Sequence, residues 1–159
     1  MIKQITAATL LAVASFAASA AEPQFYVGGD VGSSKHEDLD GRETSVGIFG
    51  GYKFDENFAI EAGYRNLGKW DILGYDLKTN QLALSVIGSV PVADQVAVYG
   101  RLGYNRVEAK IAGEKDHENK ALYGVGVSYQ FTKEISGRVE WQRPMSGSSN
   151  ISAGVAYHF

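Results

Sequence analysis

The sequence predicts an all-β fold: an eight-stranded antiparallel up-and-down transmembrane β-barrel that follows a cleaved signal peptide. Three observations support this prediction. Apolar and polar residues alternate at period two in eight segments, the connections between the segments alternate in length, and no apolar stretch after the first twenty residues is long enough for a membrane helix. The longest such stretch, residues 82–93, contains two serines and a proline, whereas a spanning helix needs about 20 apolar residues.

The first twenty residues have the order of a secretory signal. Lys3 gives a positive start, residues 5–16 are apolar, and Ala18 and Ala20 form a small-x-small cleavage site. The apolar run is too short to span a hydrocarbon core of roughly 30 Å, so a membrane anchor is not favoured. We therefore expect a signal peptide at residues 1–20 and one barrel domain over residues 21–159.

Eight segments carry the alternation that indicates a strand with one apolar and one polar face. One example is the segment in which Tyr123, Val125 and Val127 alternate with glycine and serine. In chain order, strands are expected at residues 25–31, 46–54, 58–65, 81–86, 98–105, 121–131, 138–142 and 151–159.

The connections between these strands fall into two groups. Three are short: residues 55–57, 91–95 and 132–134. Four are mostly longer and highly polar: residues near 33–43, 68–77, 109–119 and 144–149. Short periplasmic turns, longer outer loops and an even number of strands are typical of outer-membrane barrels, so both ends of the barrel are expected on the periplasmic side.

A soluble barrel or sandwich would also alternate, with its apolar face inward. Two features favour the membrane form. The polar face carries glycine, serine and full charges in mid-strand, which suits a narrow lumen filled by small and paired polar side chains. Aromatic residues gather near the strand ends on the apolar face, at the expected headgroup level. The predicted aromatic girdles contain Phe54, Phe58, Phe131 and Tyr157 at the turn end and Tyr64, Tyr104, Tyr123 and Trp141 toward the loop end.

The polar faces also carry three acids and three bases, which we interpret as a charge network in the lumen. A charge in a narrow, poorly hydrated interior must be paired, and Arg–carboxylate bonds across the axis would block it. The alternative is a water-filled lumen in which each charge is simply solvated. The network is expected to contain Asp30, Glu61 and Glu140 as acids and Arg65, Arg101 and Arg138 as bases.

At three segments the chain resembles the small porin-family or OmpA-like outer-membrane barrel domain. Residues 25–32 read FYVGGDVG, residues 62–66 read AGYRN and residues 99–104 read YGRLGY. Each segment alone is a weak signal, but their order and spacing over residues 21–159 are specific for the family, although not for an activity.

The resemblance implies a bacterial outer-membrane protein surrounded by outer-membrane lipids and lipopolysaccharide. It also implies assembly by periplasmic chaperones and the barrel-assembly machinery, with Tyr157 and the terminal Phe159 as the assembly signal. We expect a monomer without a cofactor. Wall anchoring, which belongs to the peptidoglycan-binding domain of the longer OmpA proteins, is not carried over to this chain.

No motif points to catalysis, a metal or nucleic acid. The whole chain has a net charge of −3 and no basic block, so nucleic acid is not an expected partner. His36 and His117 lie in charged segments and are expected to be solvated, while His158 faces the lumen near the periplasmic end. Lipid A deacylases, which are barrel enzymes of similar size, use a His-x-Ser pair that none of these histidines forms. Lipid A palmitoyltransferases carry an N-terminal amphipathic helix, for which the segment before residue 25 is too short.

Function must then be argued from surfaces. One hypothesis is a non-enzymatic structural protein that supports envelope integrity and holds outer loops for an extracellular ligand. The other is a small-solute pore. An eight-stranded barrel has an interior just wide enough for side chains, so the structural hypothesis is favoured.

Overall fold

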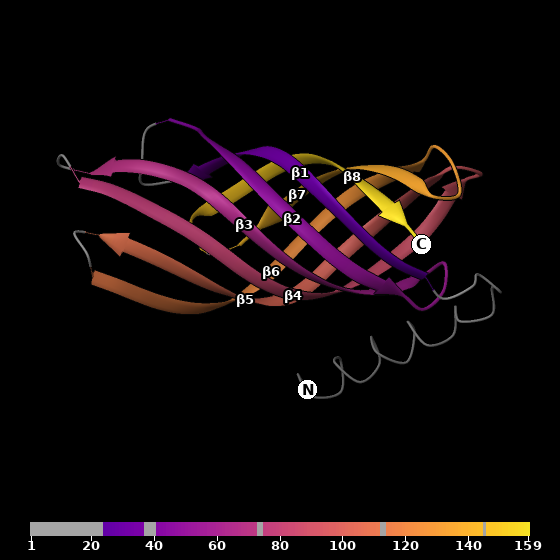
Figure 1. Cartoon of the computed structure of the whole chain (residues 1–159), viewed down its shortest axis with the longest axis horizontal. Coiled ribbons are helices and arrows are strands. Elements are labelled where there is room, and N and C mark those ends of the chain that lie inside the picture. Colours follow the sequence, from indigo (N-terminus) through magenta and orange to yellow (C-terminus); the bar gives the residue numbers. More distant parts are fainter. Residues whose placement is uncertain (1–23, 37–40, 73–74, 112–113, 145) are drawn as a thin grey trace, which may run out of the picture.

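The computed structural model describes residues 24–36, 41–72, 75–111, 114–144 and 146–159; the predicted signal peptide, residues 1–20, lies outside the described residues. Eight antiparallel strands form one closed barrel in sequence order, which confirms the predicted fold (Figure 1). No helix in the described ranges is both long and apolar enough to cross a membrane. The strands are β1 (Gln24–His36), β2 (Glu43–Lys53), β3 (Phe58–Ile72), β4 (Tyr75–Ala93), β5 (Val96–Ile111), β6 (Glu114–Gln130), β7 (Ile135–Arg143) and β8 (Ser148–His158).

Pairing between β1 and β8 closes the barrel, which leaves no edge strand around its main body. Asp30 on β1 lies opposite Gly47 of β2 on one side and Gly154 of β8 on the other. The start of β1 lies beside the end of β8, because Tyr26 is the register partner of His158. Both described ends of the barrel therefore share one end with the short turns (Figure 1).

The alternation in sequence becomes an alternation of faces. Leu102 is 71% exposed on the outside, whereas the adjacent Arg101 is 5% exposed on the inside. An apolar exterior and a polar interior reverse the arrangement of a soluble barrel and match a barrel in lipid.

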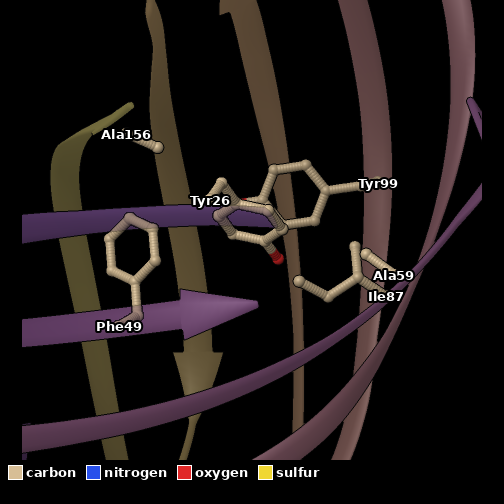
Figure 2. Packing of buried hydrophobic residues seen from close by; sticks show 6 residues of the cluster. All are labelled: Tyr26, Phe49, Ala59, Ile87, Tyr99 and Ala156. Carbon is tan, nitrogen blue, oxygen red and sulfur yellow. The ribbon is translucent and has the colours of Figure 1, made fainter. Parts of the chain in front are cut away.

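A small apolar cluster fills the lumen near the turn end. Its side chains come from six different strands and point into the same space (Figure 2). The cluster consists of Tyr26, Phe49, Ala59, Ile87, Tyr99 and Ala156.

Five predicted connections differ in extent from the structure. Those near 33–43 and 144–149 are shorter, because β1 continues to His36 and β8 begins at Ser148, and three others need larger corrections. The segments 68–77 and 109–119 were expected to be loops, but strands β3 to β6 run through nearly all of both. These strands continue past the point at which β2 and β7 stop pairing with their neighbours, at Asn66 and Tyr123 respectively. They form two long hairpins that project together at one end (Figure 1). Strands in water need no apolar face, so their polar composition resembles that of loops.

The third correction concerns residues 91–95, where β4 continues to Ala93 and leaves only Asp94 and Gln95 in the turn. Pro91 lies within the strand, next to a register shift in the pairing with β5. A strand end beside a bulge tolerates a proline, because the missing N–H interrupts no continuous ladder there.

Candidate functional site

The lumen contains the six charged residues predicted from the sequence. All six come from odd-numbered strands, and each has a glycine as a register partner on an adjacent even-numbered strand. A glycine beside a long side chain leaves room for it in a narrow interior. The pairs are Asp30 with Gly47 and Gly154, Glu61 with Gly51, Arg65 with Gly47, Arg101 with Gly124, Arg138 with Gly154, and Glu140 with Gly126.

Four of these charges form the centre of the network, and Glu61 is its main acceptor. Arg138 reaches Glu61 with two donors at 2.6 and 3.1 Å, and Arg101 reaches it at 2.7 Å. Arg101 also contacts Glu140, at 2.9 Å from its Nε and 3.0 Å from a terminal nitrogen. Since these residues lie on β3, β5 and β7, the bonds cross the lumen and connect strands that are not neighbours.

The remaining pair lies next to this centre. Arg65 donates to Asp30 at 2.7 Å and also to the side-chain oxygen of Asn150. Arg138 lies 3.7 Å from the same Asp30 carboxylate and so connects the pair to the central group. The structure thus brings all six predicted charges into one connected set of three acids and three bases, whose formal charges sum to zero.

Three aromatic residues that sequence reasoning did not assign to the network complete it. Tyr26 donates its hydroxyl to Glu61 at 2.9 Å, and Tyr99 donates to Glu140 at 2.6 Å. The guanidinium of Arg138 lies 3.5 Å from the centre of the Phe49 ring, which is a cation–π geometry. Their position could have identified them in the sequence. Each large ring stands on the otherwise polar face of an alternating strand and must therefore pack inside the lumen.

A second, uncharged layer closes the lumen toward the projecting hairpins. Asn150 donates to the hydroxyls of Ser34 and Ser45 at 2.9 and 2.6 Å. Asn105 donates to the backbone carbonyl of Pro144 at 2.6 Å, which fastens the β7–β8 connection over the opening. Together with the fully buried Leu122, these contacts fill the lumen beyond the charge network.

The outer surface carries the predicted aromatic girdle residues. Seven are exposed and Phe58 is half-buried; the exposed ones are Phe54, Tyr64, Tyr104, Tyr123, Phe131, Trp141 and Tyr157. Sequence reasoning missed three further exposed or partly exposed rings at the turn end. Tyr52 lies beside Phe54, Phe25 lies beside Tyr52, and Tyr129 lies beside Phe131. Tyr157 and Phe159 also lie outside, with ring centres 5.2 Å apart.

Within the described part of the chain, no group of three or more potential metal ligands occurs. His158 faces inward, and the side chains of His36 and His117 lie outside the part of the chain whose side chains the structure describes. A charge network with no net charge can brace the barrel and obstruct its axis.

Comparison with known proteins places this architecture in context. The family model described as "Outer membrane protein beta-barrel domain" matches residues 5–159. The chain is 29% identical to outer membrane protein A of Salmonella typhi over 99% of its own length and 56% of that protein, and 30% identical to that of Yersinia pseudotuberculosis over the same shares. It thus spans a little over half the length of these curated relatives.

Solved structures show the same fold. Neisserial surface protein A superposes with a TM-score of 0.65 at 21% identity, over 87% of this chain and all of that one. The N-terminal β-barrel domain of Pseudomonas aeruginosa OprF superposes with a TM-score of 0.61 at 16% identity, again over 87% of this chain and all of that one. At these identities the likeness concerns the fold alone.

Proposed function

We propose, from the premise that the chain belongs to the outer membrane protein beta-barrel domain family, that it is a structural protein of the outer membrane whose lumen is closed by paired charges. The family and the location in the bacterial outer membrane agree with the resemblance seen in the sequence. The closed lumen and the structural role are the proposed part.

The observation that carries the proposal is the crossing of the lumen by Arg101 and Arg138. Both arginines form ion pairs with carboxylates at 2.6–2.9 Å across the lumen, and the side chains of all four central residues are at most 12% exposed. Charge-assisted bonds of this kind are short and strong, and an eight-stranded barrel has little space around them. A solute would have to break several of them at once to pass.

The projecting hairpins support a role at the cell surface. They extend the barrel beyond its apolar band with strands whose residues are mostly polar, and they are the part of the molecule best placed to meet an extracellular ligand. Outer-membrane lipids and lipopolysaccharide would surround the apolar band. Periplasmic chaperones and the barrel-assembly machinery would act on the chain before insertion, with Tyr157 and Phe159 as the assembly signal. We propose no catalytic role for the chain.

Conductance in planar lipid bilayers tests this proposal against the small-solute pore. Purified, refolded protein should give no steady conductance steps above the lipid baseline. Steady, voltage-independent steps from the unmodified protein would favour the pore instead. In parallel, a deletion strain should become more sensitive to detergent, serum or antibiotics, and the unmodified gene should restore resistance.

A further inference from the structure

A cavity enters the barrel from the turn end, below the charge network. It has a volume of about 100 Å³, and all eight strands contribute to its walls. It continues into a wider mouth of about 930 Å³ beside the β4–β5 turn, with which it shares Lys53, Ser89 and Ser128. Because Asn105, Leu122 and Pro144 fill the opposite end of the lumen, the cavity is reached from the turn end, which faces the periplasm in this family's orientation. We call it the vestibule.

The deep part of the vestibule is apolar. Its walls include Ile87, Ala59 and Ala156, together with the rings of Tyr26 and Tyr99, all of them buried (Figure 2). The two tyrosine hydroxyls are already engaged by Glu61 and Glu140, so the rings present their carbon faces. Water in such a space has few hydrogen-bond partners, whereas a small apolar group fits it well.

One polar group in this apolar setting lacks a partner. His158 is 9% exposed and lines the vestibule; its Nε2 shares a hydrogen bond of 2.8 Å with the Ser136 hydroxyl, but its buried Nδ1 has no partner among the described residues. Buried polar atoms are rarely left unpaired, because the loss of hydration is not replaced. Nδ1 is closed off from the vestibule in this ring position, so a ligand hydroxyl supplies the missing partner only if the His158 ring turns toward the cavity.

The charges around the vestibule balance. Two bases, Lys53 and Arg138, and two acids, Asp55 and Glu56, line the vestibule. Arg138 is already paired with Glu61, and Asp55 caps the β2–β3 turn by accepting from the backbone of Asn57 and Phe58. A balanced rim gives no strong preference for an anion or a cation, which favours a neutral ligand.

We propose that the vestibule binds a small neutral amphiphile from the periplasm: one aromatic ring or branched aliphatic group, carrying a hydroxyl. An apolar protein cavity of roughly 150 Å³ is large enough to hold benzene. The vestibule, at about 100 Å³, is smaller than that cavity but open at one end, so the ring enters the apolar part while the hydroxyl remains level with His158. This inference goes beyond the proposed function, because neither envelope support nor a closed lumen requires such a site.

Benzyl alcohol is a suitable probe, and two isoleucines on opposite faces of the barrel report on it. In methyl NMR spectra of the full barrel in lipid nanodiscs, the Ile87 methyl signal should shift and saturate as benzyl alcohol is added. The Ile60 methyl, which faces lipid, should shift only in a linear, non-saturating way as the alcohol partitions into the bilayer. If Ile87 follows Ile60 without saturation, the vestibule holds only water and the proposal is overturned.

Variants then test the position and the head group. Ile87→Phe fills the vestibule and should abolish saturable binding, whereas Ile60→Phe makes the same change on the lipid face and should leave it intact. Benzyl alcohol should bind up to about tenfold more tightly than toluene, and His158→Phe should remove that advantage, since one hydrogen bond is at stake. Tighter binding of benzoate or benzylammonium would overturn the assignment of a neutral ligand. If Ile87→Phe does not fold, the titration of the unmodified protein decides by itself.

Discussion

At the scale of single residues, the lumen shows how a full charge can be enclosed in a narrow barrel. Glu61 is 2% exposed, yet it accepts bonds from Arg101, Arg138 and Tyr26, so little of its lost hydration is left unreplaced. A buried pair of this kind adds little net stability over apolar packing, but losing one partner leaves the other buried and unpaired. The residues of the network should therefore be strongly coupled.

The pair Arg101 and Glu140 tests this coupling. Arg101→Ala and Glu140→Ala should each destabilise the barrel by roughly 3–5 kcal/mol, because each leaves a buried charge without its partner. The double variant should lose clearly less than the sum, with a coupling of about 0.5–3 kcal/mol. Urea unfolding of protein refolded in lipid vesicles gives the three free energies. A second double-mutant cycle on Arg101 and Asp30 is the control, because no ion pair joins these two residues among the described ones. Strict additivity for every acid–base pair of the six would show that the charges are solvated individually.

The second prediction concerns Gly126, which lies beside Tyr99 of the network. A Cβ added at Gly126 would lie 2.4 Å from Cζ of Tyr99 and 2.7 Å from the backbone oxygen of Val139. Tyr99 cannot move freely, because its hydroxyl bonds to Glu140. We expect Gly126→Ala to destabilise the barrel by about 1–3 kcal/mol, the usual cost of overpacking.

Gly100→Ala is the matched control for this substitution. Gly100 follows Tyr99 on the opposite face of β5, and a Cβ there meets nothing within 4 Å. Urea titrations in vesicles should show little change for Gly100→Ala. An equal loss for both variants would mean that the cost comes from the strand backbone and not from the contact with Tyr99.

The alternation in sequence was enough to place the six charges on the inner face, because period two fixes the side on which a residue lies. It could not give the pairing. Glu61 and Arg138 are far apart in the chain, and their contact depends on strand tilt and on the side-chain lengths that meet across the lumen. The cation–π contact between Phe49 and Arg138 could not be predicted either, because the local sequence does not identify the partner of an apolar ring on a polar face.

At the scale of strands, the sequence predicted the number, order and direction of the elements but not their length. Strands within lipid are bounded by a change in composition, as at Asn66 and Asn80, whose side chains are exposed and share a hydrogen bond of 3.0 Å. Outside the lipid a strand need not keep one apolar face, so a polar segment gives no strand signal in the sequence. The sequence of the hairpin extensions therefore predicts loops where the structure has strands.

Two positions on β6 test the assignment of faces. Val125 is 57% exposed on the lipid side, whereas Ser128 is partly buried and lines the vestibule. Val125→Lys should cost about 2–4 kcal/mol, the penalty for a lysine near the bilayer midplane. Ser128→Lys should cost less, since its ammonium reaches water through the vestibule. Urea titration in vesicles compares the two, and equal or reversed penalties would mean that the faces are exchanged.

The connections test the orientation. Single cysteines at position 114 and at the exposed position 146, in the connection before β8, should react with a membrane-impermeant thiol reagent on intact cells. Cysteines at positions 57, 94 and 133, at the turn end, should react only after the outer membrane is permeabilised. The chain has no native cysteine, so the background is clean. Labelling at 94 but not at 114 on intact cells would reverse the orientation.

At the scale of the whole molecule, odd-numbered and even-numbered strands contribute different residues to the lumen. Odd-numbered strands supply every charge of the network, while even-numbered strands supply the glycines beside them. The interior is therefore layered along its axis: the vestibule at the turn end, the charge network in the middle, and the amide and hydroxyl layer with Leu122 toward the hairpins. Closure depends on two layers in series, which share strands β1 and β5 but use different side chains.

Because two layers close the lumen one after the other, opening one of them should not make the barrel conduct. Arg101→Ala opens only the charged layer, because Asn105, Leu122 and Pro144 still fill the lumen beyond it. This variant should be destabilised but should show no steady conductance in planar bilayers. Leu122→Gly with Asn105→Ala opens only the outer layer and should also remain closed, since the bonds of Arg101 and Arg138 to Glu61 persist.

The triple variant, which combines all three substitutions, should show small and unstable steps, because water then has a path along the axis and nothing holds that path at a fixed width. If Arg101→Ala alone conducts as well as the triple variant, the charged layer is the only barrier and the outer layer does not seal. If the triple variant folds and remains silent, the remaining pairs of Asp30 with Arg65 and Arg138 are sufficient to close the barrel.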